Sequence, residues 1–341
     1  MAAAPSAITT TRRGLLRGAG LLGLAGAAAA CGAGGPDDGA RGGRTVEHLR
    51  GETRVPADPQ RIVTVGFSDQ DPVLALGGRL VGVTDWYGDY EYATWPWAQG
   101  ALGDQKPAVL NKGAFTGTPD YRYEEIAALR PDLIIGLYTE MNEDQYTRLS
   151  RIAPTVGPPK GHKEFTAPWD VATRLVGDAL GRREEADRRI AEVNEKVARA
   201  SDAHPEFHGR TALVAERFQP GSTFVRAPGD ARSQLLSGLG FVVPDVARDG
   251  QGGGNDGGAV ADERMGLIDK DVLVWNTGSK PEVRGEIEAL PMYHNLGVVK
   301  AGRSVFIDDP LVSGAWTWGT VLSIPTVVDA LASSIAPVMK R

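Results

Sequence analysis

Short apolar runs alternate with amphipathic stretches along the chain from residue 61 onward. Apolar runs bounded by Gly, Pro or charged residues are typical of buried β-strands, and repeats with a period near 3.6 are typical of helices. Strands are predicted at 61–66, 80–83, 131–136, 211–215 and 271–275, with helices at 72–77 and 123–129. Strands and helices that alternate in this way predict an α/β fold.

The apolar pattern changes between residues 166 and 204, where no strand is predicted. Apolar residues recur at spacings of three and four from Ala186 to Val197, which predicts an amphipathic helix that ends before Pro205. Two α/β lobes joined by a helical segment are therefore expected, with limited movement between the lobes because a helix is stiffer than a Gly/Ser linker. The predicted boundaries are an N-terminal lobe at 45–165, a connector at 166–204 and a C-terminal lobe at 205–341.

The first thirty residues contain three Arg and no acid, and end in an apolar run at 18–30. That run has the length of a signal-peptide core and is short for a membrane span. Residues 11–17, TRRGLLR, resemble a twin-arginine export signal. The segment 1–30 is therefore predicted to be an export signal.

Cys31 is the only cysteine and directly follows the apolar run. Residues 28–32, AAACG, resemble a lipobox, in which Cys31 becomes the acylated N-terminus and holds the protein on the outer face of the cell membrane. Ordinary cleavage after an Ala-x-Ala pattern is the alternative, and would release a soluble protein. The Gly-rich residues 31–44 are predicted to be a flexible tether.

The 341-residue chain has a formal net charge of −6. Nucleic-acid binding is not indicated, because it would require a basic face. A hydrophobic content of 42% and a charged content of 23% are ordinary for a globular protein and leave the fold prediction unchanged.

Aromatic residues gather in one predicted loop, where six of the twelve residues from 86 to 97 are aromatic against 7% in the whole chain. The loop follows the predicted strand at 80–83, and ligands of open α/β sheets bind at the carboxyl ends of strands. Rigid amphipathic rings suit a bulky ligand, although a self-packing loop core would have the same composition. This loop and the ends of the other predicted strands give the predicted ligand-binding residues Phe67, Ser68, Asp69, Trp86, Tyr87, Trp95, Trp97, Tyr138, Arg217, Phe218 and Trp275. A turn-like stretch late in the chain adds Trp316 and Trp318.

Arg217 is the strongest polar candidate among these residues, because a guanidinium can pair bidentately with carboxylate or chelate oxygens. Arg226 and Arg232 are expected to be solvated instead. The charges near the predicted strand ends do not select the ligand, so neutral, cationic and weakly anionic ligands all stay open.

Other chemistries are less well supported by the sequence. None of the five His residues closely follows a predicted strand, so no protein-held metal is expected. Residues 66–70, GFSDQ, begin like a nucleophile elbow, but Gln70 replaces its second Gly, so an enzyme is not expected. Residues 252–257 formally satisfy G-x-G-x-x-G, but no strand precedes them and a flexible loop is predicted.

Two acids occupy matching places in the two predicted lobes. Glu124 and Glu263 each stand eight residues before an Asp that opens a predicted strand. A single acid in a first helical turn is explained by the helix macrodipole, whereas the same placement in both lobes suggests a shared role.

The chain resembles the periplasmic-binding proteins that serve siderophore, haem and cobalamin importers, and most closely the iron-siderophore-binding lipoproteins. The resemblance runs in order through residues 61–71, 123–135, 149–156 and 295–308. It implies a class III fold, in which two three-layer α/β lobes are bridged by a rigid helix and the ligand lies between them. It also implies that Glu124 and Glu263 contact an ABC permease, with Asp262 as the alternative to Glu263.

The expected function is therefore the extracytoplasmic capture of a ferric siderophore by a monomer and its delivery to an ABC permease, with no cofactor and no reaction. Haem or cobalamin as ligand, and a cell-envelope sensor or scaffold with the same fold, remain the alternatives.

Overall fold

The computed structural model describes residues 43–111, 121–246, 256–278, 280 and 282–340. The predicted export signal, Cys31, nearly all of the predicted tether and most of the Gly-rich loop at 252–257 lie outside the described residues. Both lobes belong to one compact unit, Arg41–Arg341. Within the described part of the chain, no helix is both long enough and apolar enough to cross a membrane.

The N-terminal lobe is built on a parallel sheet of five strands in the order β5-β4-β3-β6-β7. Alternate residues of a strand point to opposite faces, so Ile62 and Ile135 enter one core while Val63 and Ile134 enter another. Helices α1, α2 and α5 cover the first face, and α3 and α4 cover the second. The elements are β3 (Ile62–Thr64), α1 (Gln70–Ala75), β4 (Leu80–Thr84), α2 (Pro96–Leu102), β5 (Ala108–Leu110), α3 (Tyr123–Ala128), β6 (Leu133–Ile135), α4 (Glu143–Ser150) and β7 (Thr155–Val156), preceded by the hairpin β1 (Arg44–His48) and β2 (Gly51–Val55).

The C-terminal lobe has a mixed sheet in the order β10-β9-β8-β11-β12, in which β8, β11 and β12 are parallel and β9 and β10 are antiparallel. Helices α7, α11 and α12 pack on the face that carries Val214 and Val274. The helices from η5 to α10 pack on the face that carries Leu213 and Trp275. The elements are β8 (Ala212–Gln219), β9 (Ser222–Arg226), α7 (Ala231–Gly238), β10 (Gly257–Ala261), η5 (Asp262–Ile268), β11 (Val272–Asn276), α8 (Val283–Glu288), α9 (Pro291–Asn295), α10 (Gly297–Lys300), β12 (Ser304–Ile307), α11 (Pro310–Trp318) and α12 (Ile324–Met339).

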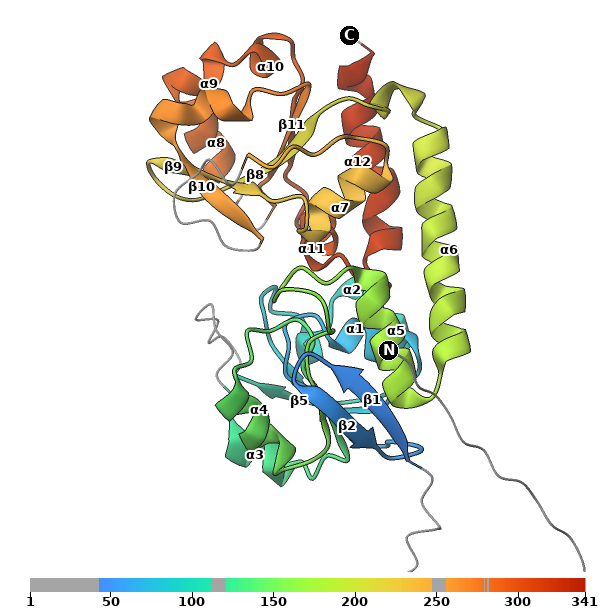
Figure 1. Ribbon diagram of the computed structural model, residues 1–341. Coiled ribbons are helices and arrows are strands. Elements are labelled where there is room, and N and C mark those ends of the chain that lie inside the picture. The colour runs from blue at the N-terminus through green and yellow to red at the C-terminus, as the bar shows by residue number, and fades with distance from the viewer. Residues whose placement is uncertain (1–42, 112–120, 247–255, 279, 281, 341) are drawn as a thin grey trace, which may run out of the picture. The chain divides into compact units, whose positions relative to one another are not determined.

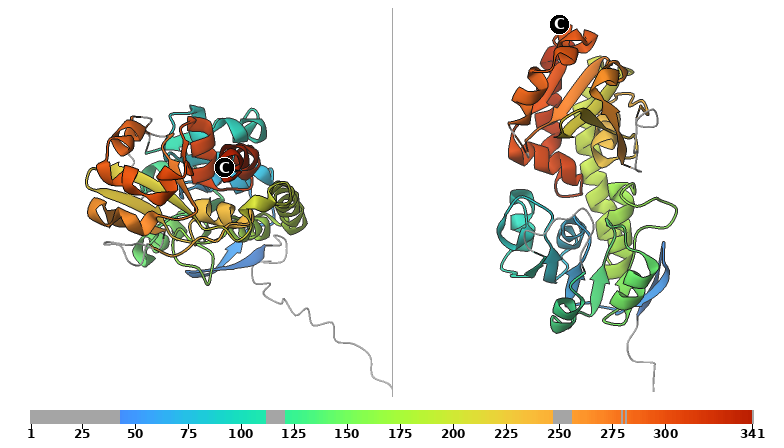
Figure 2. Two further views of the ribbon diagram at one scale, coloured as in Figure 1. Left: turned by 90° about the horizontal axis from the view of Figure 1, so that it is seen from above. Right: turned by 90° about the vertical axis from the view of Figure 1, so that its left-hand side faces the viewer.

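The connector consists of α5 (Trp169–Leu180) and the 20-residue α6 (Arg183–Asp202), which at 1.5 Å per residue is about 30 Å long. Gly181 joins the two helices with φ +66°, a left-handed conformation that glycine adopts without strain. Figures 1 and 2 show α6 running alongside α5 and α12. Its buried stripe contributes Ala186 to the core of the N-terminal lobe and Val193 to that of the C-terminal lobe. Bending α6 would therefore disturb both cores.

Two features of the fold differ from the sequence prediction. β8 continues to Gln219, four residues past the predicted end at 215, because the strand pairs with β9 in a hairpin that the local pattern did not predict. The predicted tether ends one residue too late, since Arg44 already begins β1. The first difference changes the position of Arg217 and Phe218, which lie within β8 and not in a loop after it.

Candidate ligand-binding site

A cavity of about 680 Å³ lies between residues of the two lobes, a volume within the usual range for small-molecule sites. Its lining is aromatic on the side of the N-terminal lobe and charged on the side of the C-terminal lobe. The lining residues are Phe67, Trp86, Tyr87, Gly88, Tyr90, Trp95, Tyr138, Phe165, Glu216, Phe218, Arg226, Arg232, Asp256, Gly278, Lys280, Pro310, Ser313 and Thr317.

We call the rings of Phe67, Trp86, Tyr87, Tyr138 and Trp95 the aromatic wall. Phe67 follows β3, Trp86 follows β4 and Tyr138 follows β6, so the carboxyl ends of three adjacent parallel strands deliver these rings to one edge of the sheet. The Phe67 and Trp86 ring centroids are 5.5 Å apart and stacked, and those of Trp86 and Tyr138 are 5.9 Å apart. Contacts between the rings fix their orientation, so the wall is preorganised.

Burial raises the pKa of the Tyr87 and Tyr138 hydroxyls, so both remain protonated at neutral pH and can donate hydrogen bonds. Phe165 extends the wall, with its ring centroid 4.8 Å from that of Tyr138. Its φ of +61° is unusual for a bulky residue, and such strain is characteristic of ligand sites.

Glu216, Arg226 and Arg232 form the charged floor of the cavity. Each is buried, with 5%, 7% and 3% of its surface exposed, respectively. The hairpin register pairs Glu216 with Phe224, so Arg226 lies diagonally across from Glu216 on the same face of the sheet. Glu216 forms ion pairs with both arginines, with its Oε1 3.1 Å from Arg232 Nη1.

Three further side chains complete the hydrogen bonding of the charged floor. Asp230 accepts from Arg232 Nε at 2.8 Å and from its Nη2 at 2.6 Å, while Asp256 accepts from Arg226 Nη1 at 2.8 Å. Asn276 donates from Nδ2 to Glu216 at 3.0 Å, because β11 runs parallel to β8 in register and places the two residues side by side. The charged floor is therefore a network and not a set of independent charges.

The charges of this network hold one another in the ionised form. Burial would raise the pKa of Asp230, but the positive charges of Arg232 and Arg226 outweigh burial and the pKa lies below its ordinary value. Burial would likewise lower the pKa of Arg232, yet Asp230 and Glu216 hold it well above its ordinary value.

Six of the predicted ligand-binding residues line the cavity, namely Phe67, Trp86, Tyr87, Trp95, Tyr138 and Phe218. Trp97 stacks behind Trp95, with ring centroids 4.7 Å apart, and donates from Nε1 to Asp71 at 2.9 Å. Trp97 therefore supports the aromatic wall from behind.

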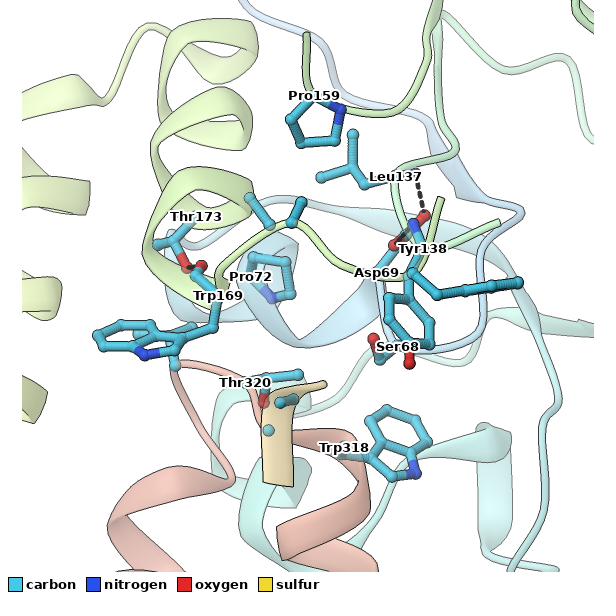
Figure 3. Close-up of a pocket in the computed structure, with 16 residues that line it drawn as sticks. Ser68, Asp69, Pro72, Leu137, Tyr138, Pro159, Trp169, Thr173, Trp318 and Thr320 are labelled. Atoms are coloured by element: carbon cyan, nitrogen blue, oxygen red, sulfur yellow. Dashed lines mark hydrogen bonds between the residues drawn. The ribbon is translucent and has the colours of Figure 1, made fainter. Parts of the chain in front are cut away.

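Ser68, Asp69 and Trp318 lie in a separate pocket of only about 40 Å³, drawn in Figure 3. The Asp69 carboxylate accepts hydrogen bonds from the backbone N–H groups of Leu137 at 2.7 Å, Tyr138 at 3.0 Å and Gly66 at 3.1 Å. Burial raises the pKa of Asp69 to about 6, because its effect exceeds that of the three hydrogen bonds, which lower the pKa. Asp69 ties the loops after β3 and β6 together and so positions Tyr138.

Arg217 points away from the cavity. Successive strand residues face opposite sides of a sheet, so Arg217 lies on the other face from Glu216. There it forms a buried bidentate pair with Asp262, at 2.8 and 2.9 Å. Arg217 therefore has its partner within the protein and is not a proposed ligand contact.

The prediction that Arg226 and Arg232 are solvated is wrong. Both are buried in the charged floor, because Glu216, Asp230 and Asp256 supply carboxylates that offset the cost of desolvating them.

Trp275 and Trp316 are fully buried in the two cores of the C-terminal lobe and do not line the cavity. Trp275 donates to Ser304 Oγ at 3.2 Å, and Trp316 donates to the Arg232 carbonyl at 3.1 Å. Their neighbours in sequence, Asn276 and Thr317, face the charged floor and are 3.0 Å apart. The prediction reached the right segments but chose the side chains that face the cores.

Glu124 and Glu263 are both exposed, on α3 and η5, respectively. Asp262 is buried by its pair with Arg217. Of the two adjacent acids in η5, only Glu263 is accessible to a partner.

The model of the periplasmic binding protein family matches residues 63–311 of the chain. The chain belongs to the periplasmic binding protein family. A probable siderophore-binding lipoprotein of Bacillus subtilis, YfiY, is 28% identical over 281 residues, which cover 78% of this chain and 80% of YfiY.

Solved structures of this family have the same fold. A periplasmic solute binding protein of Mycobacterium smegmatis aligns with a TM-score of 0.76 and 31% identity, covering 87% of this chain and 99% of that one. Staphylococcus aureus SirA, solved with staphyloferrin B, aligns with a TM-score of 0.69 and 25% identity, covering 85% and 98% of the two chains. The class III fold expected from the sequence is confirmed.

Proposed function

We propose that this periplasmic binding protein captures a ferric siderophore outside the cytoplasm and delivers it to an ABC permease. The observation that carries this proposal is the cavity of about 680 Å³ between the aromatic wall and the charged floor. YfiY, named a probable siderophore-binding lipoprotein, and SirA, solved with staphyloferrin B, support the assignment. In the described residues no group of three or more His, Cys, Asp or Glu could hold a metal ion.

The aromatic wall offers a siderophore rigid contact area whose rings lose little entropy on binding. The hydroxyl groups of Tyr87 and Tyr138 supply polar contacts that fix the orientation of the ligand. No reaction on the ligand is part of this proposal. The protein binds the intact chelate, and α6, anchored in both cores, limits closure of the lobes to a small movement.

Delivery would use Glu124 and Glu263 as one permease contact on each lobe. Their exposure leaves both carboxylates available for Arg side chains of a partner. The sequence of the leader adds that Cys31 would be acylated, which would hold a monomeric protein at the outer face of the membrane beside its permease.

The proposal is tested by uptake of radioactive iron in a strain that lacks this protein, complemented with the wild type or with the pair Glu124→Gln and Glu263→Gln. Wild-type protein should restore uptake of one ferric siderophore, and the double variant should bind that chelate normally but transport little. The matched control is Glu125→Gln with Glu286→Gln, an exposed acid beside Glu124 on α3 and an exposed acid of the C-terminal lobe on α8, which should transport normally.

A chain that restores no uptake of any ferric siderophore would contradict the proposal. Full transport by the double variant would contradict the docking role alone.

A further inference from the structure

The two arginines of the charged floor offer no unmatched nitrogen to a ligand. Arg232 places Nε and Nη2 on Asp230 and Nη1 on Glu216. Arg226 places Nε and Nη2 on Glu216 and Nη1 on Asp256. Each of the six guanidinium nitrogens thus already faces a carboxylate of the protein.

The charges of the described residues around the floor cancel. Glu216, Asp230 and Asp256 balance Arg226, Arg232 and Lys280, which is exposed at the cavity. An anionic ligand would have to displace an internal carboxylate or lie beside it, and an unpaired charge in a partly desolvated site is costly. The rest of the lining consists of aromatic rings, small residues and hydroxyl groups, which bind without requiring ligand charge.

We propose that the cavity selects iron chelates that carry no net negative charge, and that Glu216 and Asp256 set this selectivity by neutralising Arg226 and Arg232. This inference rests on the proposed function and narrows its ligand class. Three hydroxamate groups on Fe³⁺ give an uncharged iron centre, whereas three catecholates leave an excess of three negative charges. A trihydroxamate-type chelate fits the neutral floor, and a tricatecholate does not.

A charge series on one scaffold tests the inference without changing the iron centre. A linear trihydroxamate with a terminal amine is loaded with Fe³⁺ and used in its ammonium, N-acetyl and N-succinyl forms, whose net charges are +1, 0 and −1. Tryptophan quenching gives the affinity of the mature protein for each form. The N-succinyl form should bind at least about tenfold more weakly than the N-acetyl form, because it brings a carboxylate to an already neutralised floor.

The variant Asp256→Asn should largely abolish this preference. Asp256 is the most accessible acid of the network, with 34% of its side chain exposed, so its replacement disturbs the buried part least. Removing its charge leaves Arg226 in excess, and the affinity for the N-succinyl form relative to the N-acetyl form should rise on the order of tenfold. Asp187→Asn is the matched control, because Asp187 pairs with Arg174 and Arg183 on the exposed side of α6 and changes the net charge equally.

The outcomes separate the inference from the proposed function. Binding of the N-succinyl form as tight as that of the N-acetyl form, or an unchanged ratio in a folded Asp256→Asn variant, would overturn the charge selectivity while leaving siderophore capture intact. Selective tight binding of an anionic ferric tricatecholate would have the same meaning. Failure of every ferric chelate to bind would overturn both.

Discussion

Asp71 on α1 provides a test of how the two lobes are joined. Its side chain is completely buried, and its Oδ2 accepts hydrogen bonds from Trp97 Nε1 and from Thr320 Oγ1 of the C-terminal lobe. Its Oδ1 has no hydrogen-bond partner among the described residues. Burial raises the pKa of Asp71 to about 7, although the hydrogen bonds from Thr320 and Trp97 lower it in part.

The sign of the pH effect follows from this shift. Between about pH 4 and pH 7 the folded protein holds a proton on Asp71 that the unfolded chain has released, so the contribution of Asp71 to stability falls as the pH rises. The slope is about 1.4 kcal/mol per pH unit, which amounts to roughly 2–3 kcal/mol between pH 5 and pH 7.

The variant Asp71→Asn should remove this dependence, because an amide oxygen can still accept from Thr320 and Trp97 but does not ionise. Urea unfolding at pH 5, 6, 7 and 8 gives the free energy of unfolding of each protein. The variant should match the wild type within about 1 kcal/mol at pH 5 and exceed it by roughly 2–3 kcal/mol at pH 8. The exposed substitution Asp187→Asn should show no such divergence. Wild-type and Asp71→Asn profiles that run parallel across this range would refute the reasoning.

Two further predictions concern Trp86, which lines the cavity, and Arg217, which points away from it. Trp86→Ala should weaken binding of the cognate chelate about tenfold or more, since it removes a central ring of the aromatic wall. The control Phe306→Ala, which removes a half-buried ring on β12, should bind the chelate normally. Normal binding by Trp86→Ala would exclude the Trp86 ring as a ligand contact. Arg217→Ala should lower the free energy of unfolding by about 3–5 kcal/mol, because Asp262 is left buried and unpaired, while chelate affinity is unchanged. Replacing both partners, Arg217→Met with Asp262→Leu, should recover most of that stability in urea unfolding. If Arg217→Ala instead lost chelate affinity without losing stability, Arg217 would belong to the ligand site.

The aromatic wall could be predicted from the sequence because it depends on a local rule. Phe67, Trp86 and Tyr138 each come within three residues of the end of a strand of a parallel sheet, and all such strand ends meet at one edge. The density of rings between residues 86 and 97 strengthened that prediction.

The charged floor could not be predicted in the same way, because it depends on pairing between strands. Glu216 meets Arg226 only through the register of the β8–β9 hairpin, and Asn276 only through the parallel pairing of β11 with β8. Successive residues of a strand face opposite sides of the sheet. This alternation along β8 and β11 would have placed Glu216 and Arg217 on opposite faces, and likewise Asn276 and Trp275. The sequence contained that signal once the predicted strand at 211–215 is extended by the four residues that the hairpin adds to β8, and the one at 271–275 by a single residue.

The most direct test of siderophore capture is a tryptophan-fluorescence titration of the mature protein, because Trp86 and Trp95 line the cavity. The titrants are hydroxamate, catecholate, citrate-type and mycobactin-type ferric siderophores. Haem and cobalamin are titrated separately as the alternative ligands. We predict saturable quenching by a ferric siderophore at submicromolar concentration, reduced in Trp86→Ala. Tight binding of haem or cobalamin alone would contradict the substrate, and no binding by a folded protein across the whole panel would contradict ligand capture itself.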